Sequence, residues 1–541
     1  MSTAPLASGP SGPDALRPLL DTVLDALTQG ATARGGPLPA GGPAEVAQRL
    51  RTALGDPLPR YGSPDALHTL VRALAEGAAD PADPLCAAHL HCPPLAVATA
   101  ADLAASALNP SLDSWDQAPA ASELEAAVAQ ALARLVYGSP DTDATPDGQD
   151  ARDVPAPQDA PDARDAPAPQ DAPDARDAPA TQAAPATEAG MNTQAAPDNR
   201  GARGSQDTQA TPDTQGVRDP HSGPLDLPAD ALVTTGGTES NQLALLLARE
   251  KHHGIQLVCG ANAHHSLHRA AWLLGLPEPV VLPAPAGTLD LAALDSALTD
   301  LPGPLLVAAT AGTTDAGLID PLPDIARLCA AHGARLHIDA AYGGGLLFSD
   351  RHRGRLDGLA HADTVTLDLH KLGWQPVAAG LLAVRDPTDL APLAHRAEYL
   401  NADDDTEAGH PDLLGRSLRT TRRPDVLKIA VTLKTLGRDG IGRLVDQVCA
   451  HAEELADLIA AHPGFELHDH PTISTVLFRP HGATDDTVAA VRRTLLDQGR
   501  AVLGRATLDG RRWLKATLLN PHTRPGDLAT LLKLVEGHTP R

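Results

Sequence analysis

The feature that most constrains this chain is the alternation of short apolar runs with helical runs between residues 232 and 384. The apolar runs are 255–258, 280–282, 305–309, 335–338, 364–367 and 381–384, and the helical runs between them include 241–251, 266–274, 289–298 and 322–331. Strands that alternate with helices in this way pair mainly in parallel, because each helix carries the chain back across the sheet. The pattern therefore predicts an α/β fold with a mostly parallel sheet, which we assign to a large domain over residues 223–423.

The regions on either side of this predicted sheet have different patterns. Apolar residues recur at helical spacing in 16–27 and 124–135, so residues 1–138 are predicted to form a helical N-terminal segment. After the sheet come a long helical region (426–459), a strand (470–480) and a closing helix (527–535). This order predicts a small C-terminal α+β domain over residues 424–541.

Residues 139–222 differ from the rest of the chain. They contain three near-copies of a 12-residue unit that begins DARD, and they carry 15 Asp and one Glu against six Arg. So acidic and Pro-rich a stretch has few apolar side chains whose burial could offset the entropy lost on ordering. We expect a disordered acidic insertion that divides the globular part of the chain in two.

The overall charge limits the classes of partner. The formal net charge of −25 argues against binding nucleic acid or an anionic membrane surface through bulk electrostatics. No apolar run has the length of a membrane span, and the first residues lack the basic and apolar regions of a signal peptide. The five cysteines are scattered and odd in number, which is typical of a reducing compartment. We therefore expect a cytoplasmic protein that acts on a small molecule, with no membrane and no nucleic acid as partner.

Lysine is rare in this chain, which draws attention to position 371. Six of the 43 basic residues are lysine, and Lys371 follows a histidine inside the apolar stretch TLDLHKL. A lysine at the end of a strand can form a Schiff base with an aldehyde, whereas arginine cannot. The choice of lysine therefore indicates a position where a primary amine is needed.

Three further groups follow predicted strands, where the functional residues of a parallel sheet gather. Residues 234–241 read TTGGTESN and open a helix, so Gly237 and Thr238 indicate a phosphate site, with a plain tight turn as the alternative. Asp339 ends an apolar strand, where a carboxylate is costly unless it is paired; it could also cap a helix. His264 stands at the entry to a helix, where its ring could stack on a ligand or lie in a surface turn.

Taken together, these four groups describe one cofactor. A phosphate cradle, a ring-stacking histidine, an aspartate for a pyridinium nitrogen and a lysine that forms a Schiff base are the parts of a pyridoxal phosphate site. The sequence therefore predicts pyridoxal 5'-phosphate as the cofactor.

The same residues resemble the group II pyridoxal-phosphate-dependent amino-acid decarboxylases, a branch of the fold type I transferases. The resemblance runs from about residue 84 to the C-terminus apart from the insertion, and its motifs are TGGTESN (235–241), AHHS (263–266), AGTTDAGLIDP (311–321), DAAYGG (339–344) and DLHK (368–371). It implies a homodimeric fold type I enzyme with Lys371 and His264 as catalytic residues. The cofactor-binding residues that it implies are Gly237, Thr238, His264, Thr313, Asp339, Ala341, Asp368, His370 and Lys371.

Within this family the chain is similar to bacterial decarboxylases of diamino acids. The stretches that carry this likeness are AHLHCPP (88–94), SLDSWDQAPA (111–120) and SLRTTRRPDVLK (417–428). The resemblance implies His89 and His91 in the substrate pocket, and Asp113 of the neighbouring subunit as the partner of a distal ammonium, with a helix cap as the alternative for Asp113. The H-x-H-C pattern at 89–92 could suggest metal ligands, but its match to the family's substrate-pocket strand predicts no metal.

The chain departs from the family in one loop. Family members carry a tyrosine there that protonates the substrate carbon after CO2 leaves, whereas residues 400–419 contain no tyrosine and His410 stands at the expected place. Histidine can donate a proton near neutral pH, so His410 is the predicted catalytic donor. The predicted reaction is decarboxylation of 2,4-diaminobutyrate, ornithine or lysine to the amine. Oxidative deamination to an aldehyde, and a catalytically silent binding partner, are the alternatives.

Overall fold

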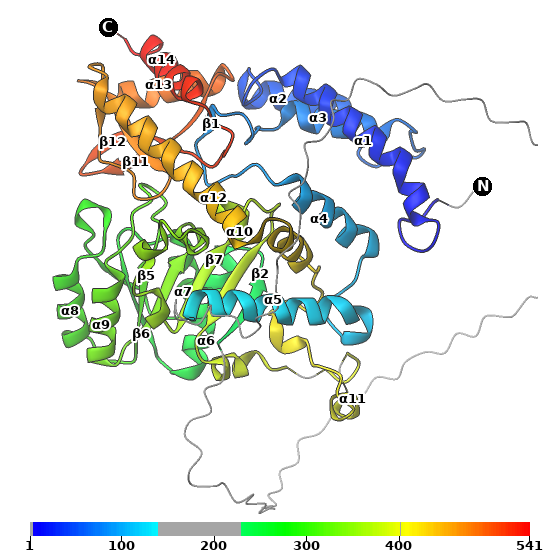
Figure 1. Cartoon of the computed structure of the whole chain (residues 1–541), viewed down its shortest axis with the longest axis vertical. Helices are drawn as coiled ribbons and strands as arrows, with labels where there is room; N and C mark the ends of the chain where they lie inside the picture. The colour runs from blue at the N-terminus through cyan, green and yellow to red at the C-terminus, as the bar shows by residue number, and fades with distance from the viewer. Residues whose placement is uncertain (1–3, 139–228, 396, 401, 541) are drawn as a thin grey trace, which may run out of the picture. The chain divides into compact units, whose positions relative to one another are not determined.

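The computed structural model describes residues 4–138, 229–395, 397–400 and 402–540 (Figure 1). The predicted acidic insertion at 139–222 lies outside the described residues. The α-helices are α1 (Gly12–Arg34), α2 (Gly42–Leu54), α3 (Ala66–Gly77), α4 (Ala96–Leu108), α5 (Pro119–Tyr137), α6 (Gly237–Lys251), α7 (His265–Leu273), α8 (Leu291–Asp300), α9 (Leu322–His332), α10 (Leu369–Leu372), α11 (Asp403–Glu407), α12 (Val426–Ala461), α13 (Asp485–Asp497) and α14 (Pro525–Gly537). The strands are β1 (Cys86–Ala87), β2 (Asp230–Thr234), β3 (Gln256–Gly260), β4 (Val280–Leu282), β5 (Leu305–Thr310), β6 (Arg335–Ala340), β7 (Thr364–Asp368), β8 (Gly380–Val384), β9 (Phe465–Leu467), β10 (Thr475–Pro480), β11 (Val502–Leu508) and β12 (Arg511–Thr517).

The large domain is built on a seven-stranded sheet in the order β2-β8-β7-β6-β5-β3-β4. Strand β8 runs antiparallel to both of its neighbours, and the other pairs are parallel, so the predicted mostly parallel α/β sheet is confirmed. The register brings Thr310, Asp339 and Thr366 side by side on β5, β6 and β7. Because Thr310 ends β5 and Asp339 is the last residue but one of β6, polar groups meet at the carboxyl edge of the sheet.

Helices cover both faces of this sheet. Along β5, Val307 and Ala309 belong to an apolar core shared with α5, α8, α9 and the first part of α12. Their neighbours Leu306 and Ala308 point to the other face and pack in a cluster with α6 and α7. Both faces are therefore shielded from water, which explains why nearly every residue of the central strands is buried rather than every second one.

The C-terminal domain holds a five-stranded sheet in the order β1-β11-β12-β10-β9. The predicted strand at 470–480 corresponds to β10, but the sequence reading did not find the hairpin β11–β12 or helix α13. Arginines interrupt the apolar pattern of the hairpin, for example Arg505 and Arg512, so the strand signal is weak there. Strand β1 reaches this sheet from the N-terminal segment and pairs with β11 in parallel.

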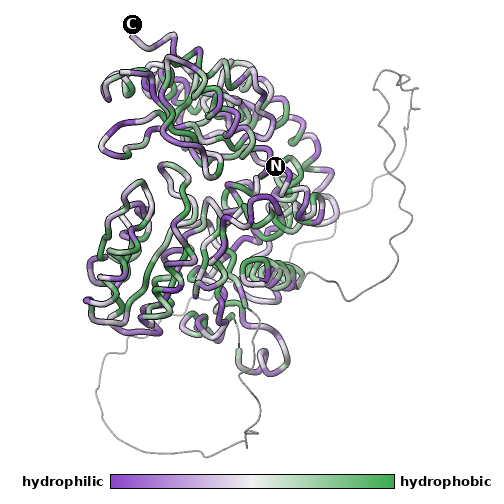
Figure 2. The backbone as a smooth tube through the Cα atoms, turned by 60° about the vertical axis from the view of Figure 1, so that its left-hand side comes forward, coloured by the Kyte–Doolittle hydropathy of each residue, from purple (hydrophilic) through white to green (hydrophobic). Residues whose placement is uncertain are grey.

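Helix α12 connects the two cores. Its buried residues up to Cys449 belong to the core of the large domain, and those from Ala452 to Ile459 belong to the core of the C-terminal domain. The long helix that the sequence predicts at 426–459 is thus shared between two packing units, and a break at Gly437, whose φ is 66°, divides it into two helical segments. Figure 2 shows apolar and polar residues alternating along the helical turns of the described chain, as expected where one side of a helix packs inward.

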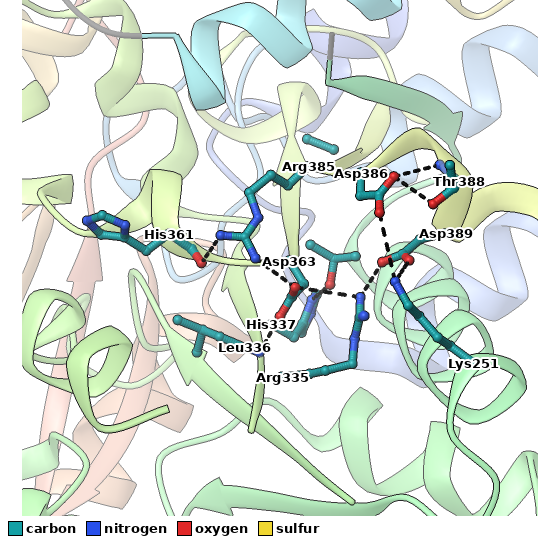
Figure 3. A network of polar contacts seen from close by, with 12 residues as sticks. Lys251, Arg335, Leu336, His337, His361, Asp363, Arg385, Asp386, Thr388 and Asp389 are labelled. Atoms are coloured by element: carbon teal, nitrogen blue, oxygen red, sulfur yellow. Dashed lines mark hydrogen bonds and ion pairs between the residues drawn. The ribbon is translucent and has the colours of Figure 1, made fainter. Parts of the chain in front are cut away.

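The opposite, amino edge of the large sheet is held by a network of ion pairs (Figure 3). Arg335, the first residue of β6, pairs with Asp389 and lies 3.9 Å from Asp363. Asp389 also pairs with Lys251 at the end of α6, and Asp363 accepts a 2.8 Å hydrogen bond from Arg385. These contacts join the amino ends of β6 and β7 to α6 and to the chain that follows β8.

Two general features complete the description of the fold. Across the described ranges, we find no helix with both the length and the apolarity that a membrane crossing needs. All five cysteines are free thiols, and Cys86 is the one that is only partly buried.

Candidate active site

Side chains from the carboxyl ends of five strands surround a cavity of about 470 Å³. These strands are β2, β3, β5, β6 and β7, so residues that are far apart in sequence share one wall. Predicted residues that line the cavity are Gly237, Thr238, His264, Asp339, Ala341, Asp368, His370 and Lys371, together with His89 from the N-terminal segment. The parallel register therefore brings together most of the predicted site.

Lys371 enters the cavity from α10, a single turn that follows β7 directly. Its Nζ lies 2.9 Å from Oδ2 of Asp368, the last residue of the strand, and its side chain is 18% exposed. The neighbouring Leu369 and Leu372 are buried and anchor the turn. Lys371 is thus an amine that is held in place by a carboxylate but still open to the cavity.

The Asp368 carboxylate has a second oxygen, Oδ1, that is buried and has no hydrogen-bond partner. His370 lies nearby, with Nε2 at 3.6 Å from Asp368 Oδ2, and burial lowers the pKa of His370. The imidazole is therefore mainly neutral at pH 7. A buried oxygen without a partner is costly, so it marks a place where a bound ligand can supply the missing hydrogen bond.

Asp339, at the end of β6, is 5% exposed and is held by neutral groups. Its Oδ2 accepts a 2.8 Å hydrogen bond from Asn241 Nδ2, and its Oδ1 accepts one of 3.1 Å from the backbone N–H of Ala341. Within the part of the chain that the structure describes, no lysine or arginine pairs with this carboxylate. A cationic ligand atom, such as a protonated ring nitrogen, would complete it.

Asn241 is a site residue that the sequence reading quoted in a motif but gave no role. Its Oδ1 lies 2.9 Å from Thr366 Oγ1 and 3.0 Å from His337 Nε2, and its Nδ2 also donates to Ser266. His337 is fully buried, and burial lowers its pKa to about 4, so its ring is neutral. This relay fixes the amide of Asn241 and therefore the direction in which it holds Asp339.

The glycine turn at 236–237 opens the 15-residue helix α6 toward the cavity. A Cβ atom on Gly236 would lie 2.9 Å from His370 Cε1, and one on Gly237 would lie 3.0 Å from Ala341 Cβ. Side chains are therefore excluded where the backbone N–H groups of the helix start face the cavity. This arrangement suits a phosphate group, as the sequence predicts for Gly237 and Thr238.

His264 stands at the N-cap of α7, with its Nδ1 2.8 Å from Ser266 Oγ. Burial is the largest influence on its pKa and lowers it, although Asp339 acts in the opposite direction. A neutral imidazole on the cavity wall is suited to stacking against a flat ring rather than to binding an anion.

In the turn after β5, the threonine that lines the main cavity is the residue after the predicted Thr313. Thr313 is buried, its hydroxyl accepts a 3.0 Å hydrogen bond from Leu318 N, and it lines a neighbouring cavity. Thr314 is the threonine of this turn that lines the main cavity. Gly312 and Gly317 adopt positive φ in this turn. The path of the backbone through the turn decides which threonine faces the main cavity, and the sequence pattern does not show that path.

The predicted substrate residues do not all reach this cavity. His89 lines it, whereas His91 is exposed and is absent from its wall. Asp113 is 8% exposed, its Oδ1 has no partner, and it does not line the cavity of its own chain. Among the residues that the structure describes, no cluster of His, Cys, Asp or Glu is arranged to hold a metal ion.

His410 also lies away from the cavity of its own chain. Its ring packs on Trp115, with 4.9 Å between ring centroids, so the loop and the segment that carries Asp113 meet. Tyr399, which is 84% exposed, comes one residue before the stretch in which the sequence shows no tyrosine. His410 and Asp113, two of the predicted residues that do not line the cavity, therefore lie in neighbouring segments.

Lys515 is a cavity residue that the sequence reading missed. It comes from β12 in the C-terminal domain, is 7% exposed, and donates a 2.9 Å hydrogen bond to the carbonyl of Thr314. Burial lowers its pKa, and Asp315 opposes that shift. The signal was available in part, because Lys515 is another of the six lysines in an arginine-rich chain.

These features fit pyridoxal phosphate. The helix start at Gly237 suits its phosphate, His264 its ring face, Asp339 its ring nitrogen and Lys371 its aldehyde. The fit rests on the buried Asp339 without a cationic partner, on the unpartnered Asp368 Oδ1 and on the turn where a Cβ would clash.

Comparison with known proteins finds pyridoxal-dependent decarboxylases. The pyridoxal-dependent decarboxylase conserved domain matches residues 219–481. An L-2,4-diaminobutyrate decarboxylase of Rhizobium meliloti (strain 1021) is 34% identical over 508 residues, which cover 90% of this chain and 84% of that relative. One of Acinetobacter baumannii is 28% identical and covers 83% of this chain and 78% of its own length.

Solved structures give the same result. The glutamate decarboxylase domain of a diaminobutyrate-pyruvate transaminase and L-2,4-diaminobutyrate decarboxylase from Vibrio parahaemolyticus has a TM-score of 0.73 at 26% identity. The match covers 99% of this chain and 97% of that one. The structure of Oryza sativa TDC with PLP and tryptamine has a TM-score of 0.75 at 20% identity, which is a likeness of fold.

Proposed function

This chain belongs to the pyridoxal-dependent decarboxylase family, and we propose that it converts an L-diamino acid, with L-2,4-diaminobutyrate as the first candidate, to the diamine and CO2. It is a pyridoxal-phosphate-dependent amino-acid decarboxylase of fold type I. The substrate class is supported by two relatives that bear the name L-2,4-diaminobutyrate decarboxylase and match most of this chain. Ornithine and lysine are the other substrates to compare.

The observation that carries the proposal is the placement of Lys371 and Asp339 in one cavity at the carboxyl edge of the sheet. When bound there, pyridoxal phosphate takes up the electron pair that the departing carboxylate leaves on the substrate carbon. The amine of Lys371 would hold the cofactor, and Asp368 orients that amine from 2.9 Å away. Asp339 would hold the proton of the ring nitrogen, and Asn241 keeps its carboxylate directed inward.

Two more residues would position the substrate. His264 presents a neutral ring, because burial lowers its pKa, and would pack against one face of the cofactor. The cavity wall carries two lysines, Lys371 and Lys515. Because Lys371 would hold the cofactor, Lys515 is our candidate for binding the α-carboxylate. Its hydrogen bond to Thr314 O holds the ammonium at the wall without neutralising it.

A homodimer is part of the proposal. Exposed leucines on the N-terminal helices support it: Leu19, Leu24 and Leu27 on α1, Leu50 and Leu54 on α2, and Leu67, Leu70 and Leu74 on α3. The neighbourhood of His410 and Asp113, which is away from the cavity of its own chain, supports a role for these residues in the cavity of a second subunit. There His410 would deliver the proton that replaces CO2 on the substrate carbon.

The reaction is tested by measuring CO2, amine and peroxide from the purified enzyme with a panel of amino acids. We expect CO2 and the diamine in equal amounts from a diamino acid, with little release from glutamate. Stoichiometric peroxide would instead indicate oxidative deamination to an aldehyde. If borohydride fixes no cofactor to the purified chain, the chain would instead be a catalytically silent binding partner.

The subunit arrangement is tested by mixing two inactive variants, Lys371→Ala and His410→Ala. If His410 acts in the cavity of its partner, mixed dimers contain one complete site, and about a quarter of wild-type activity returns after random exchange of subunits. No recovery, or a monomer by light scattering, would contradict this arrangement.

A further inference from the structure

A second cavity of about 480 Å³ opens beside the cofactor cavity. His264, His265 and Thr314 line both cavities, so the two share a wall. Beyond this wall, the second cavity is bounded by the turn after β5 and by residues 507–509 at the tip of the hairpin β11–β12. A substrate that reacts at Lys371 can therefore extend its side chain toward the second cavity.

The wall of the second cavity is acidic. Its lining contains the carboxylates of Asp315 and Asp509 and neither lysine nor arginine. Asp509 already has a partner, since its Oδ2 lies 3.7 Å from His468 Nε2. Asp315 is exposed, and the described part of the chain offers it no hydrogen bond and no ion pair. Asp315 is therefore the carboxylate of this wall that is free to bind a ligand.

Lys515 lines the first cavity and lies close enough to Asp315 for the two charges to influence each other. Its Nζ donates a 2.9 Å hydrogen bond to the carbonyl of Thr314, the residue that precedes Asp315. The two side chains influence each other electrostatically but form no direct ion pair in the described chain. A positive group on the wall of the first cavity thus stands beside a negative group on the wall of the second.

We propose that Asp315 binds the side-chain ammonium of the substrate and so selects diamino acids. The inference rests on the proposed decarboxylation and assigns its substrate selectivity to one residue. A diamino acid carries a carboxylate near one end and an ammonium at the other, which matches Lys515 and Asp315. A charge-assisted hydrogen bond to Asp315 stabilises an ammonium, and the same carboxylate repels an acidic side chain.

Asp113, which the sequence suggests for this role, is the competing residue. It is 8% exposed and lines neither cavity of its own chain, so it can act only from a second subunit. Asp315 needs no second subunit to face the substrate side chain. If Asp315 binds the ammonium, Asp315→Asn should alter the selectivity for diamino acids. If Asp113 binds it, Asp113→Asn should do so instead.

The test compares L-2,4-diaminobutyrate with L-norvaline, a neutral amino acid of nearly the same shape. The measured quantity is kcat/KM for CO2 release from L-2,4-diaminobutyrate divided by that from L-norvaline. It is measured in the cofactor-loaded wild type and in Asp315→Asn, Asp113→Asn and Asp300→Asn. Asp300 is an exposed carboxylate at the end of α8 and controls for a change of net charge. Norvaline has the same α-carboxylate, so an indirect effect on Lys515 cancels in the ratio.

We expect Asp315→Asn to lower the ratio by about 10- to 100-fold, as for the loss of a charged hydrogen bond. The ratio should stay at the wild-type value in Asp300→Asn. If Asp315→Asn keeps the wild-type ratio, or if Asp113→Asn alone lowers it, the inference is overturned while the proposed function stands. If the cofactor-loaded wild type releases no CO2 from any diamino acid, the proposed function fails and the inference fails with it.

Discussion

The two ends of strand β6 hold buried charge in different ways. At the amino end, Arg335 pairs with Asp389 and lies 3.9 Å from Asp363, within a network that includes Lys251 and Arg385 (Figure 3). At the carboxyl end, Asp339 is held by the amide of Asn241 and the backbone of Ala341, which are neutral donors. One strand thus carries neutralised charges at one end and a carboxylate without a counter-charge at the other.

This difference separates a structural site from a chemical one. Where both partners of a buried ion pair belong to the chain, substituting one of them lowers the stability of the fold. The other partner is then left buried without a counter-charge. A buried carboxylate without a counter-charge lowers stability by itself, so its retention indicates that a ligand supplies the missing positive charge. The comparison therefore predicts that substitutions at the two edges affect different measurements.

The largest effect is expected from Lys371→Ala at the carboxyl edge. CO2 release should fall by more than about 10³-fold, because the cavity loses the amine that would hold the cofactor. The measurement is CO2 release together with the visible absorbance of the cofactor. Lys251→Ala at the amino edge is the matched lysine control and should keep its activity. A variant at Lys371 whose cofactor is still fixed to the chain by borohydride would contradict the assignment.

Asp339→Asn should lower kcat by about 10²- to 10³-fold, since an amide cannot hold the ring nitrogen in its protonated form. The same change should leave the urea midpoint at least as high as in the wild type, because it removes a buried negative charge that has neutral donors. Kinetics of the cofactor-loaded variant check the first statement, and urea denaturation of the cofactor-free chain checks the second. An unchanged kcat would remove Asp339 from the site.

Asp389→Asn should show the reverse behaviour at the amino edge. Asp389 is 4% exposed, and its loss leaves Arg335 without its closest counter-charge, so the free energy of unfolding should fall by about 3 kcal/mol. Activity per folded, cofactor-loaded molecule should stay at the wild-type level. A drop in kcat without a drop in stability would show that the amino edge also serves the chemistry.

His337 lies on β6 between the two edges, and its buried ring should make the free energy of unfolding depend on pH. Burial lowers its pKa in the fold to about 4, below the unfolded value near 6.5, so the unfolded chain binds more protons between these values. Stability should therefore be fully present above pH 6.5 and should decrease as the pH falls toward 4. The loss should be about 3 kcal/mol larger in the wild type than in His337→Gln, as measured by urea unfolding at each pH. Equal slopes would show that His337 is not buried as a neutral ring.

The smallest effect is expected from Asn241→Ala, which removes a neutral support of Asp339. The kcat should fall by about tenfold, as for groups that orient a ligand-binding side chain. Rescue by Asn241→Gln is not expected, since the longer side chain would displace the amide from Thr366 and His337. A loss as large as that of Asp339→Asn would instead show that Asn241 contacts the cofactor itself.

Much of the large domain could be predicted because its signals are local. The strands near 255, 305, 335 and 364 are short runs rich in apolar and β-branched residues, and polar residues such as Asp339 stand at or just after their carboxyl ends. The hairpin β11–β12 was missed because arginines interrupt its pattern, and Lys515 was missed with it. The motif predicts Thr313 for the site, whereas Thr314 lines the cavity, because a motif cannot show which of two adjacent side chains turns toward a cavity.

Lysine scarcity illustrates the limit of a compositional argument. Lys428 is as rare a choice as Lys371, yet it is buried in ion pairs of 3.1 Å with Asp102 and Asp425. Lys251 is also an ion-pair lysine, whereas Lys515 and Lys371 line the cavity. The scarcity of lysine draws attention to all six positions, but only the surroundings of each lysine distinguish those in ion pairs from the two that line the cavity.

The sequence by itself determined the alternation of strands and helices, the cofactor and the residue types at the strand ends, because each depends on neighbours within a few positions. The tertiary structure decided which of these residues meet. Strand register aligns Asp339 with Thr310 and Thr366, and the hairpin of another domain delivers Lys515 to Thr314, 201 residues away in the chain. It also placed His410 and Asp113 away from the cavity of their own chain. Such meetings depend on packing between distant segments, which no local pattern of residues encodes.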